Sequence, residues 1–378
     1  MTIEQRLADW AASCAADRAR RGLPPEAYTS PELLRLEQDR VFGHGWIVVA
    51  HASEVARAGD YVTFDVAGHP VVVVRGRDDV LRAFSNVCPH RSALIARDCG
   101  HANFFTCPYH AWSYDLTGRL MGAPHMDRDA LGDIRLKELR LELWHGLVFV
   151  NLDSDAAPLA PALAGLERWI TPQRVDAQKV ILREDVRMAC NWKVLIENFC
   201  ESYHVFCVHK ATLEDSTPTS TIESRPGGPG FNHHTMRLVG DGQRVMGQRL
   251  GLEGEDAVLN HLVCIFPAMA FSMTPGHALW VSVMPDGPDH LRARMWQTAM
   301  PDAATGEVSA KHSRAANDLL HRFMGEDKAV IEGLQRGLAA GTGNRAPLHP
   351  WEATNWEFAL GLLDRLGLQD AAGELRAV

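Results

Sequence analysis

Two short segments that pair a cysteine with a histidine constrain this chain more than any other feature. The first, CPH, holds Cys88 and His90, and the second, CPYH, holds Cys107 and His110. Sixteen residues separate His90 from Cys107, and in both segments a proline follows the cysteine. Chance does not explain this repetition, so we expect the four side chains to bind metal together.

Two kinds of metal site fit two cysteines and two histidines. A zinc site is one alternative, but zinc fingers place the two cysteines together and the two histidines together, whereas here each segment mixes them. The mixed order favours a Rieske two-iron, two-sulfur cluster, in which two histidines replace two cysteines on one iron. We therefore predict that Cys88, His90, Cys107 and His110 bind such a cluster.

A second group of ligand-type side chains lies in the apolar segment 191–209, which we expect to be helical. At about 100° per residue, Glu201 and His204 lie on neighbouring faces of a helix, whereas His209 is rotated by about 140° from His204. A bulge or a helix end must therefore bring His209 back. Two histidines and one carboxylate are the recurring iron ligands of non-haem oxygenases. We expect His204 and His209 to be the two histidines.

Composition narrows the class of protein. The length of 378 residues predicts two structural units, and 46% apolar with 22% charged residues is typical of a folded soluble protein. The net charge of −9 and the lack of a Lys/Arg run argue against nucleic-acid binding. We find no apolar stretch of about eighteen residues and no signal peptide, so we expect a cytoplasmic protein without a membrane segment.

The pattern along the chain predicts three regions. Residues 1–40 read as helices, one over 3–21 and one that begins at Ser30, with Pro31 in its first turn. Residues 41–155 contain short β-rich runs separated by turns, which predicts an all-β unit. Residues 156–378 combine helical segments with a β-rich block, so the overall fold class is α+β.

The Cys/His segments, with Arg91, Tyr109 and Trp112 beside them, resemble the Rieske motif of the ring-hydroxylating oxygenase family, which includes quaternary-ammonium oxygenases. Respiratory Rieske proteins have a cysteine three residues after the first histidine, where this chain has Ala93. The resemblance spans nearly the whole chain. It implies an N-terminal Rieske domain over 41–155, and a helix-grip-like catalytic domain with an antiparallel sheet over 156–378, on which the helices of 1–40 pack.

The resemblance also implies roles for individual residues. Asp327, in the segment GEDKAVIEGLQRGL, matches the third iron ligand, and Glu326 is the competing candidate. Glu201 matches a carboxylate that joins the two metal centres across a subunit interface by hydrogen bonding to His204 and to a Rieske histidine of a neighbouring chain. Asn198 matches a residue near the iron, with an ordinary buried amide as the alternative.

The function implied is that of a terminal oxygenase that uses O2 and externally supplied electrons to hydroxylate, dihydroxylate or dealkylate a small molecule. The chain lacks a dinucleotide fingerprint, so NAD(P)H must be oxidised by a separate reductase, with or without a ferredoxin. The resemblance implies a homotrimer and leaves a β subunit open. We slightly favour an aromatic compound or aromatic acid as substrate over the alternative, a betaine, carnitine or choline-type compound, which Glu201 suggests. A Rieske electron carrier without catalysis would leave the second site unexplained.

Several further residues carry weaker predictions. The strands that we expect to border the substrate pocket contain large apolar residues that fit either pocket or core: Phe266, Pro267, Phe271, Trp280 and Met284. Three cysteines outside the Cys/His segments match no ligand position, and we expect them to be packed thiols: Cys99, Cys200 and Cys207.

Overall fold

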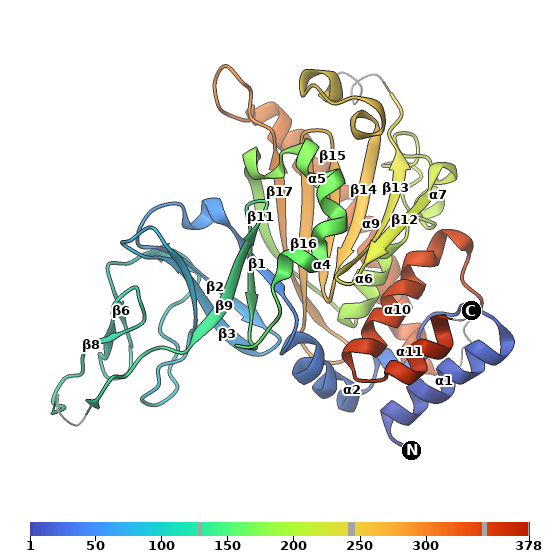
Figure 1. Ribbon diagram of the computed structural model, residues 1–378. Coiled ribbons are helices and arrows are strands. Elements are labelled where there is room, and N and C mark those ends of the chain that lie inside the picture. Colours follow the sequence, from blue (N-terminus) through green and yellow to red (C-terminus); the bar gives the residue numbers. More distant parts are fainter. Residues whose placement is uncertain (128–130, 241–245, 342–345, 377) are drawn as a thin grey trace. The chain divides into compact units, whose positions relative to one another are not determined.

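The computed structural model describes residues 1–127, 131–240, 246–341, 346–376 and 378 (Figure 1). It divides into two compact units. One unit is Phe42–Pro158, and the other joins Met1–Val41 to Leu159–Val378. The N-terminal segment therefore belongs to the same unit as the C-terminal half of the chain.

The unit Phe42–Pro158 is built from strands, as predicted. Its larger sheet has seven strands in the order β1-β10-β9-β4-β3-β2-β5, and its smaller sheet has three in the order β6-β7-β8. The strands are β1 (Ile47–His51), β2 (Asp60–Val66), β3 (His69–Arg75), β4 (Leu81–Ser85), β5 (Cys99–His101), β6 (Phe105–Thr106), β7 (Ser113–Tyr114), β8 (Leu120–Gly122), β9 (Glu138–Trp144) and β10 (Leu147–Asn151).

Buried β-branched and aromatic side chains hold this unit together. All five residues of β10 are buried, and so are the four valines Val71–Val74 of β3. Such runs suit strands because branched side chains pack well on a pleated surface. Cys99 does not join this core. It is exposed on β5, which corrects the expectation that it is packed, because a strand as short as β5 lies at the edge of the sheet.

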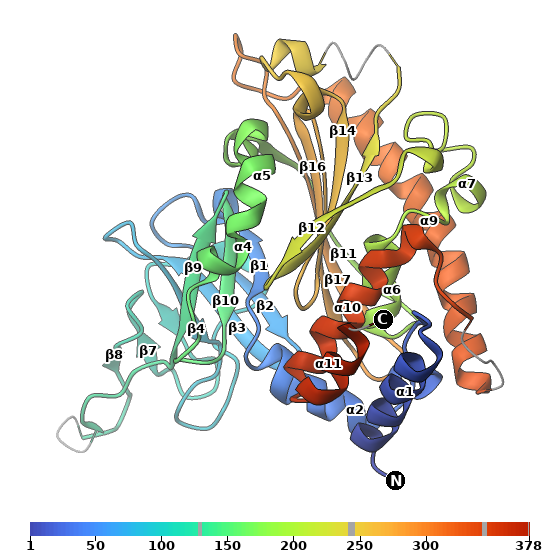
Figure 2. The ribbon, with the colours of Figure 1, turned by 45° about the vertical axis from the view of Figure 1, so that its right-hand side comes forward.

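The second unit is organised around one antiparallel sheet of seven strands in the order β11-β17-β16-β15-β14-β13-β12. Figure 2 shows this sheet with helices on both sides. Its strands are β11 (Lys179–Met188), β12 (Glu223–Gly228), β13 (Phe231–Arg237), β14 (Leu259–Ile265), β15 (Met269–Thr274), β16 (His277–Pro285) and β17 (Leu291–Ala299). The predicted α+β class with an antiparallel sheet is confirmed.

The helices of this unit come from both ends of the chain and from its middle. They are α1 (Ile3–Asp17), α2 (Pro31–Leu36), α4 (Leu159–Leu163), α5 (Glu167–Gln173), α6 (Trp192–Cys200), α7 (Val205–Val208), α9 (Ala310–Ala340), α10 (Ala353–Arg365) and α11 (Gln369–Arg376). Within the described ranges, none of the helices combines the length and the apolar character that crossing a membrane requires.

The two N-terminal helices follow their capping signals. The Ser30 hydroxyl accepts a hydrogen bond from the amide of Leu33, and Pro31 occupies the first turn of α2, as predicted. Helix α1 ends at Asp17, four residues earlier than expected, because Arg18 adopts a left-handed backbone conformation with φ of 51°. This conformation closes the helix in the same way that a C-terminal glycine does.

Opposite faces of the large sheet meet different partners. Helix α6 contacts β14, β15 and β16, and α9 contacts β11 and α6. Trp169 of α5 packs against His233 and His261, whose side chains point to the other face. Because successive side chains of a strand alternate between faces, each strand contributes to both environments.

Candidate metal centres and the cavity beside them

The two Cys/His segments fold into loops with the same backbone hydrogen bonds. In the first loop the amide of Cys88 donates to the carbonyl of Ala93, and in the second the amide of Cys107 donates to the carbonyl of Trp112, both at 2.8 Å. The fourth residue after each cysteine, Ser92 or Ala111, has φ of 58° and donates its amide back to the cysteine carbonyl. The repeated sequence thus forms a repeated turn.

The side chains of these loops separate into buried sulfurs and outward imidazoles. Cys88 and Cys107 are both buried in the core of the unit, at 1% and 2% exposure. The rings of His90 and His110 lie next to each other with centroids 4.7 Å apart. His90 is stacked on Trp112, with ring centroids 4.4 Å apart and an interplanar angle of 3°.

This donor set fits a Rieske cluster. It offers two thiols and two imidazoles, and Nδ1 of His110 is a buried nitrogen without a hydrogen-bond partner among the described residues. Burial, together with the charges of His90 and Arg91, lowers the pKa of His110. The neutral imidazole, which is the form that binds metal, is therefore favoured.

A break between two helices brings the two histidines of the second site together. Helix α6 ends at Cys200, and Glu201 is extended with φ of −131° and ψ of 157°. The hydroxyl of Thr354 in α10 donates to the carbonyl of Cys200, which satisfies a carbonyl that the helix end leaves free. The segment 191–209 is therefore not one helix: α7 starts again at Val205, and His204 and His209 lie at its two ends.

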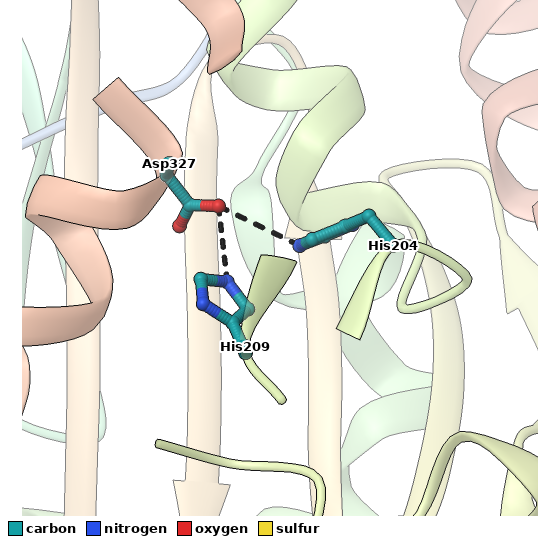
Figure 3. Close-up of side chains that lie close together, drawn as sticks. All are labelled: His204, His209 and Asp327. Carbon is teal, nitrogen blue, oxygen red and sulfur yellow. Dashed lines mark ion pairs between the residues drawn. The ribbon is translucent and has the colours of Figure 1, made fainter. Parts of the chain in front are cut away.

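His204, His209 and Asp327 lie together, although Asp327 comes from the distant helix α9 (Figure 3). Oδ1 of Asp327 is 3.0 Å from Nε2 of His209 and 3.6 Å from Nε2 of His204. The three ligand atoms lie within 4.8 Å of one another. Oδ1 is buried, and apart from these two imidazoles it has no polar partner among the described residues. Two imidazoles and a carboxylate that converge in this way fit a mononuclear non-haem iron.

Each of these histidines has a carboxylate on its other ring nitrogen. Oε1 of Glu201 lies 2.5 Å from Nδ1 of His204, and Oε2 of Glu326 lies 2.8 Å from Nδ1 of His209. Burial opposes a charge on His209, but Asp327 and Glu326 outweigh it and raise the pKa of His209. The carboxylates fix both rings with Nε2 toward Asp327, as carboxylates behind metal-binding histidines do.

A cavity of about 490 Å³ opens beside the three residues. Its lining includes Asn198, Phe199 and Glu201 from the region of α6, the cavity-facing side chains of β14 to β17, and a stripe of α9. Asn198 is half-buried and borders the cavity rather than the protein core. The site thus combines a ligand set with room for a small molecule.

The large apolar residues of the strands belong to the core and not to this cavity. All five candidates are buried, but none of them lines it: Phe266, Pro267, Phe271, Trp280 and Met284. Their strand neighbours Ser272 and Leu279 do line it, because alternate residues point to opposite faces. Trp280 instead stacks on Trp296 with ring centroids 5.1 Å apart.

A buried ion pair that was not predicted from the sequence holds α6 in place. Nζ of Lys193 lies 2.6 Å from Oε1 of Glu37, and both side chains are fully buried. The indole of Trp192 donates to the same carboxylate at 2.8 Å, and Tyr28 donates to Glu197 at 2.6 Å. The N-terminal segment is thereby tied to the helix that leads into the site. No local pattern marks such a pair, since its partners are more than 150 residues apart.

Two cysteines near the second site were expected to be packed thiols. Cys200 is buried as expected, but Cys207 is exposed on α7.

Comparisons with known proteins match both parts of the chain. Residues 45–141 match the Rieske [2Fe-2S] domain, and residues 175–367 match the ring hydroxylating alpha subunit (catalytic domain). The solved structure of the quaternary ammonium Rieske monooxygenase CntA in complex with an inhibitor is 25% identical, with a TM-score of 0.81. That comparison covers 95% of this chain and 98% of the other.

Two curated relatives differ in the substrates that their names state. The carnitine monooxygenase oxygenase subunit of Escherichia coli (strain K12) is 40% identical over 202 residues, which cover 52% of this chain. The chain spans about half of that relative's length, 54%. The biphenyl 2,3-dioxygenase subunit alpha of Rhodococcus jostii (strain RHA1) is 27% identical over 409 residues, which cover 90% of this chain and 82% of that protein.

Proposed function

The chain belongs to the family of ring-hydroxylating alpha subunits with a Rieske [2Fe-2S] domain, and from this premise we propose that it is the terminal oxygenase component of a multicomponent oxygenase. The observation that carries the proposal is the convergence of His204, His209 and Asp327 beside a cavity, in a chain that also holds the two Cys/His loops. Bound at these places, the cluster supplies single electrons and the iron activates O2.

The chain's own residues have separate tasks in this proposal. Cys88, His90, Cys107 and His110 hold the cluster. His204, His209 and Asp327 hold the iron on one side and leave the cavity side free for O2 and substrate. Glu201 and Glu326 orient the two imidazoles through Nδ1. Asn198 and Phe199 position the substrate where the cavity meets Glu201.

The electrons require a partner in this scheme. We propose a separate reductase, with or without a ferredoxin, that oxidises NAD(P)H and reduces the cluster. From the family resemblance we also propose a homotrimer, in which Glu201 contacts a Rieske histidine of the neighbouring chain. Whether a β subunit is required would be tested by reconstituting the activity from purified components.

We propose that the substrate is an apolar compound, and that aromatic compounds are the preferred class. Two phenylalanines, Phe199 and Phe323, line the cavity, together with several aliphatic side chains. Within the part of the chain that the structure describes, no Trp or Tyr lines it, so the aromatic cage that typically binds a quaternary ammonium group is not formed there. No Lys or Arg among the described lining residues offers a counter-ion to an aromatic acid.

A quaternary ammonium substrate is the second candidate. It is supported by Glu201, and by the names of the carnitine enzyme and of the CntA structure. The carboxylates of Glu201 and Asp327 at one end of the cavity also favour a cation over an anion. The reaction would then be mono-oxygenation or N-demethylation of a betaine, carnitine or choline-type compound.

A substrate screen tests the proposal. The iron-loaded protein is supplied with electrons by a surrogate reductase, and O2 consumption is recorded with arenes, aromatic acids and quaternary amines. We expect consumption that depends on an arene and yields an oxygenated product. Activity on quaternary amines alone would select the second candidate. Cluster reduction without substrate-dependent O2 consumption on any of them would contradict an oxygenase and support an electron carrier.

A further inference from the structure

The cavity has a polar region away from the three proposed iron ligands. At the turn between β15 and β16 and on the neighbouring strand β17, the side chains of Thr274, His277 and Gln297 line it. The helix α9 runs along the cavity from His312 to Asp327. Ala316, which accepts a hydrogen bond from Gln297, lies eleven residues before Asp327, or about 16 Å along the helix axis. An occupant that reaches both ends must be elongated.

Two polar atoms in this region are buried and have no hydrogen-bond partner among the described residues. One is Oε1 of Gln297, whose side chain is only 2% exposed and whose Nε2 donates to the carbonyl of Ala316 at 3.3 Å. The other is Nε2 of His277. Buried polar atoms are nearly always paired in native proteins, so two unpaired atoms on one cavity wall indicate a missing partner.

The sheet register places these two residues on the same face of adjacent strands, about 7–8 Å apart as diagonal neighbours are. Gln297 lies directly opposite Leu279, and His277 is two residues from Leu279 on the same strand, so His277 and Gln297 are diagonal neighbours on one face. Leu279 is a neighbour of both residues on this face and also lines the cavity. One small group of a ligand can therefore contact both side chains.

The chemistry of the pair disfavours an anionic group. Burial, with a smaller contribution from His312, lowers the pKa of His277 to about 4, so that its ring is neutral at pH 7. Oε1 of Gln297 requires a donor, and an imidazole nitrogen can donate or accept. No Lys or Arg lines the cavity within the described ranges, and a desolvated anion without a cation is unfavourable.

We propose that Gln297 and His277 form a subsite that binds a hydroxyl group at the end of the substrate remote from the carbon to be oxidised. The hydroxyl donates its proton to Oε1 of Gln297, and its oxygen accepts a hydrogen bond from the Nε2–H of the neutral His277 ring. Held at that end, the substrate presents its other end to His204, His209 and Asp327. The inference rests on the proposed oxygenase function and names the class of its substrate, an elongated apolar compound with a distal hydroxyl.

Equilibrium dialysis of the metal-loaded protein without O2 tests the subsite, with biphenyl, biphenyl-4-ol and biphenyl-4-carboxylate as probes. We expect biphenyl-4-ol to bind roughly fivefold to tenfold more tightly than biphenyl, as one or two hydrogen bonds provide. Gln297→Met and His277→Phe should each remove most of this preference, measured within each variant as the ratio of the dissociation constants of the two probes. Leu279→Met, which changes the wall between them but no polar group, should retain the preference.

Several results would overturn the subsite. These are equal binding of biphenyl and biphenyl-4-ol to the wild type, a preference that survives both substitutions, tighter binding of the carboxylate than of the alcohol, or no binding of any probe. If Gln297→Met does not fold, the loss of the hydroxyl preference in His277→Phe is the result that decides. Dialysis requires no turnover, so loss of the hydroxyl preference with normal O2 consumption rejects only the subsite. A hydroxyl preference without substrate-dependent O2 consumption rejects only the oxygenase function.

Discussion

Oε2 of Glu326 lies 2.8 Å from Nδ1 of His209, and the same oxygen accepts a hydrogen bond from the hydroxyl of Thr212 at 2.6 Å. Glu326 therefore faces the back of the imidazole, whereas its neighbour Asp327 faces Nε2 on the other side of the ring. Two adjacent carboxylates of one helix thus meet one histidine in different ways. This arrangement supports Asp327 as the ligand and Glu326 as the residue that orients His209.

We predict that Asp327→Ala removes the mononuclear iron and leaves the cluster in place. The substitution deletes one of three ligand atoms, whereas Cys88 and Cys107 lie in the other unit of the chain. Iron analysis should show a loss of about one iron per chain, with the visible absorption of the cluster retained. Glu326→Gln is the matched control and should weaken iron binding only about 10-fold to 100-fold. Full iron content and normal turnover in Asp327→Ala would reject the assignment.

For Glu201→Gln we predict that both metal centres are retained and that electron transfer between them is slower. The glutamine keeps one oxygen to accept from the amides of Tyr203 and His204, but it loses the negative charge beside Nδ1 of His204. Stopped-flow reoxidation of the reduced cluster, with substrate and O2 present, should slow by about 10-fold or more. A reoxidation rate equal to that of the wild type would show that Glu201 does not take part.

The buried pair of Lys193 and Glu37 predicts a large loss of stability when only one partner is removed. Lys193→Met leaves the carboxylate of Glu37 buried, where it still accepts a hydrogen bond from the indole of Trp192. The free energy of unfolding should fall by about 3–5 kcal/mol. The double variant Glu37→Leu/Lys193→Met should recover much of this loss. Urea unfolding measures both, and a double variant that is less stable than the single one would contradict the expected coupling.

Buried histidines predict a loss of stability in acid. Burial lowers the pKa of His233 and His234 to about 3 and that of His261 to about 4. Because these values lie below the unfolded value of about 6.5, the unfolded chain binds more protons below that pH. The stability present above pH 6.5 is therefore lost as the pH falls toward 4, by up to about 1.4 kcal/mol per pH unit for each histidine.

Urea unfolding of the metal-free protein between pH 7 and 5 measures this dependence. His261→Gln removes one of the three histidines, so the free energy of unfolding should fall less steeply with decreasing pH, by up to about 1.4 kcal/mol per pH unit. His290→Gln replaces a histidine whose side chain is 56% exposed, and it should leave the slope unchanged. A free energy of unfolding that is independent of pH over this range would contradict the buried, neutral state of the three histidines.

Much of the architecture follows from local sequence patterns. The short β-rich runs of the first unit and the capped start of α2 depend on residues close together in the chain, whereas β1 pairs with the distant β10 and β11 with the distant β17. The identical turns of the two Cys/His loops likewise follow from their repeated sequence. The end of α6 is different, because it depends on Thr354 and on the extended backbone of Glu201, and it divides a segment that reads as one helix.

The features that could not be predicted depend on contacts between distant residues. The family resemblance predicts Asp327 as the ligand, but the local sequence does not show which of Glu326 and Asp327 faces Nε2 of His209, because packing sets the rotation of α9. The lining of the cavity depends on which face of each strand is turned inward, and a continuous apolar run such as that around Trp280 carries no alternation that reveals the face. The pairing of Lys193 with Glu37 has no local signature.

Labelling of the product with isotopic oxygen tests the central claim most directly. The protein, with both iron centres confirmed by analysis, is given reductase, NAD(P)H, ¹⁸O2 and a substrate that stimulates O2 consumption, and the product is examined by mass spectrometry. We predict that one or two ¹⁸O atoms enter the product and that Asp327→Ala abolishes the label while its cluster is still reduced. Oxygen that is converted only to peroxide or water, with every substrate class tried, would contradict the assignment of this chain as a terminal oxygenase.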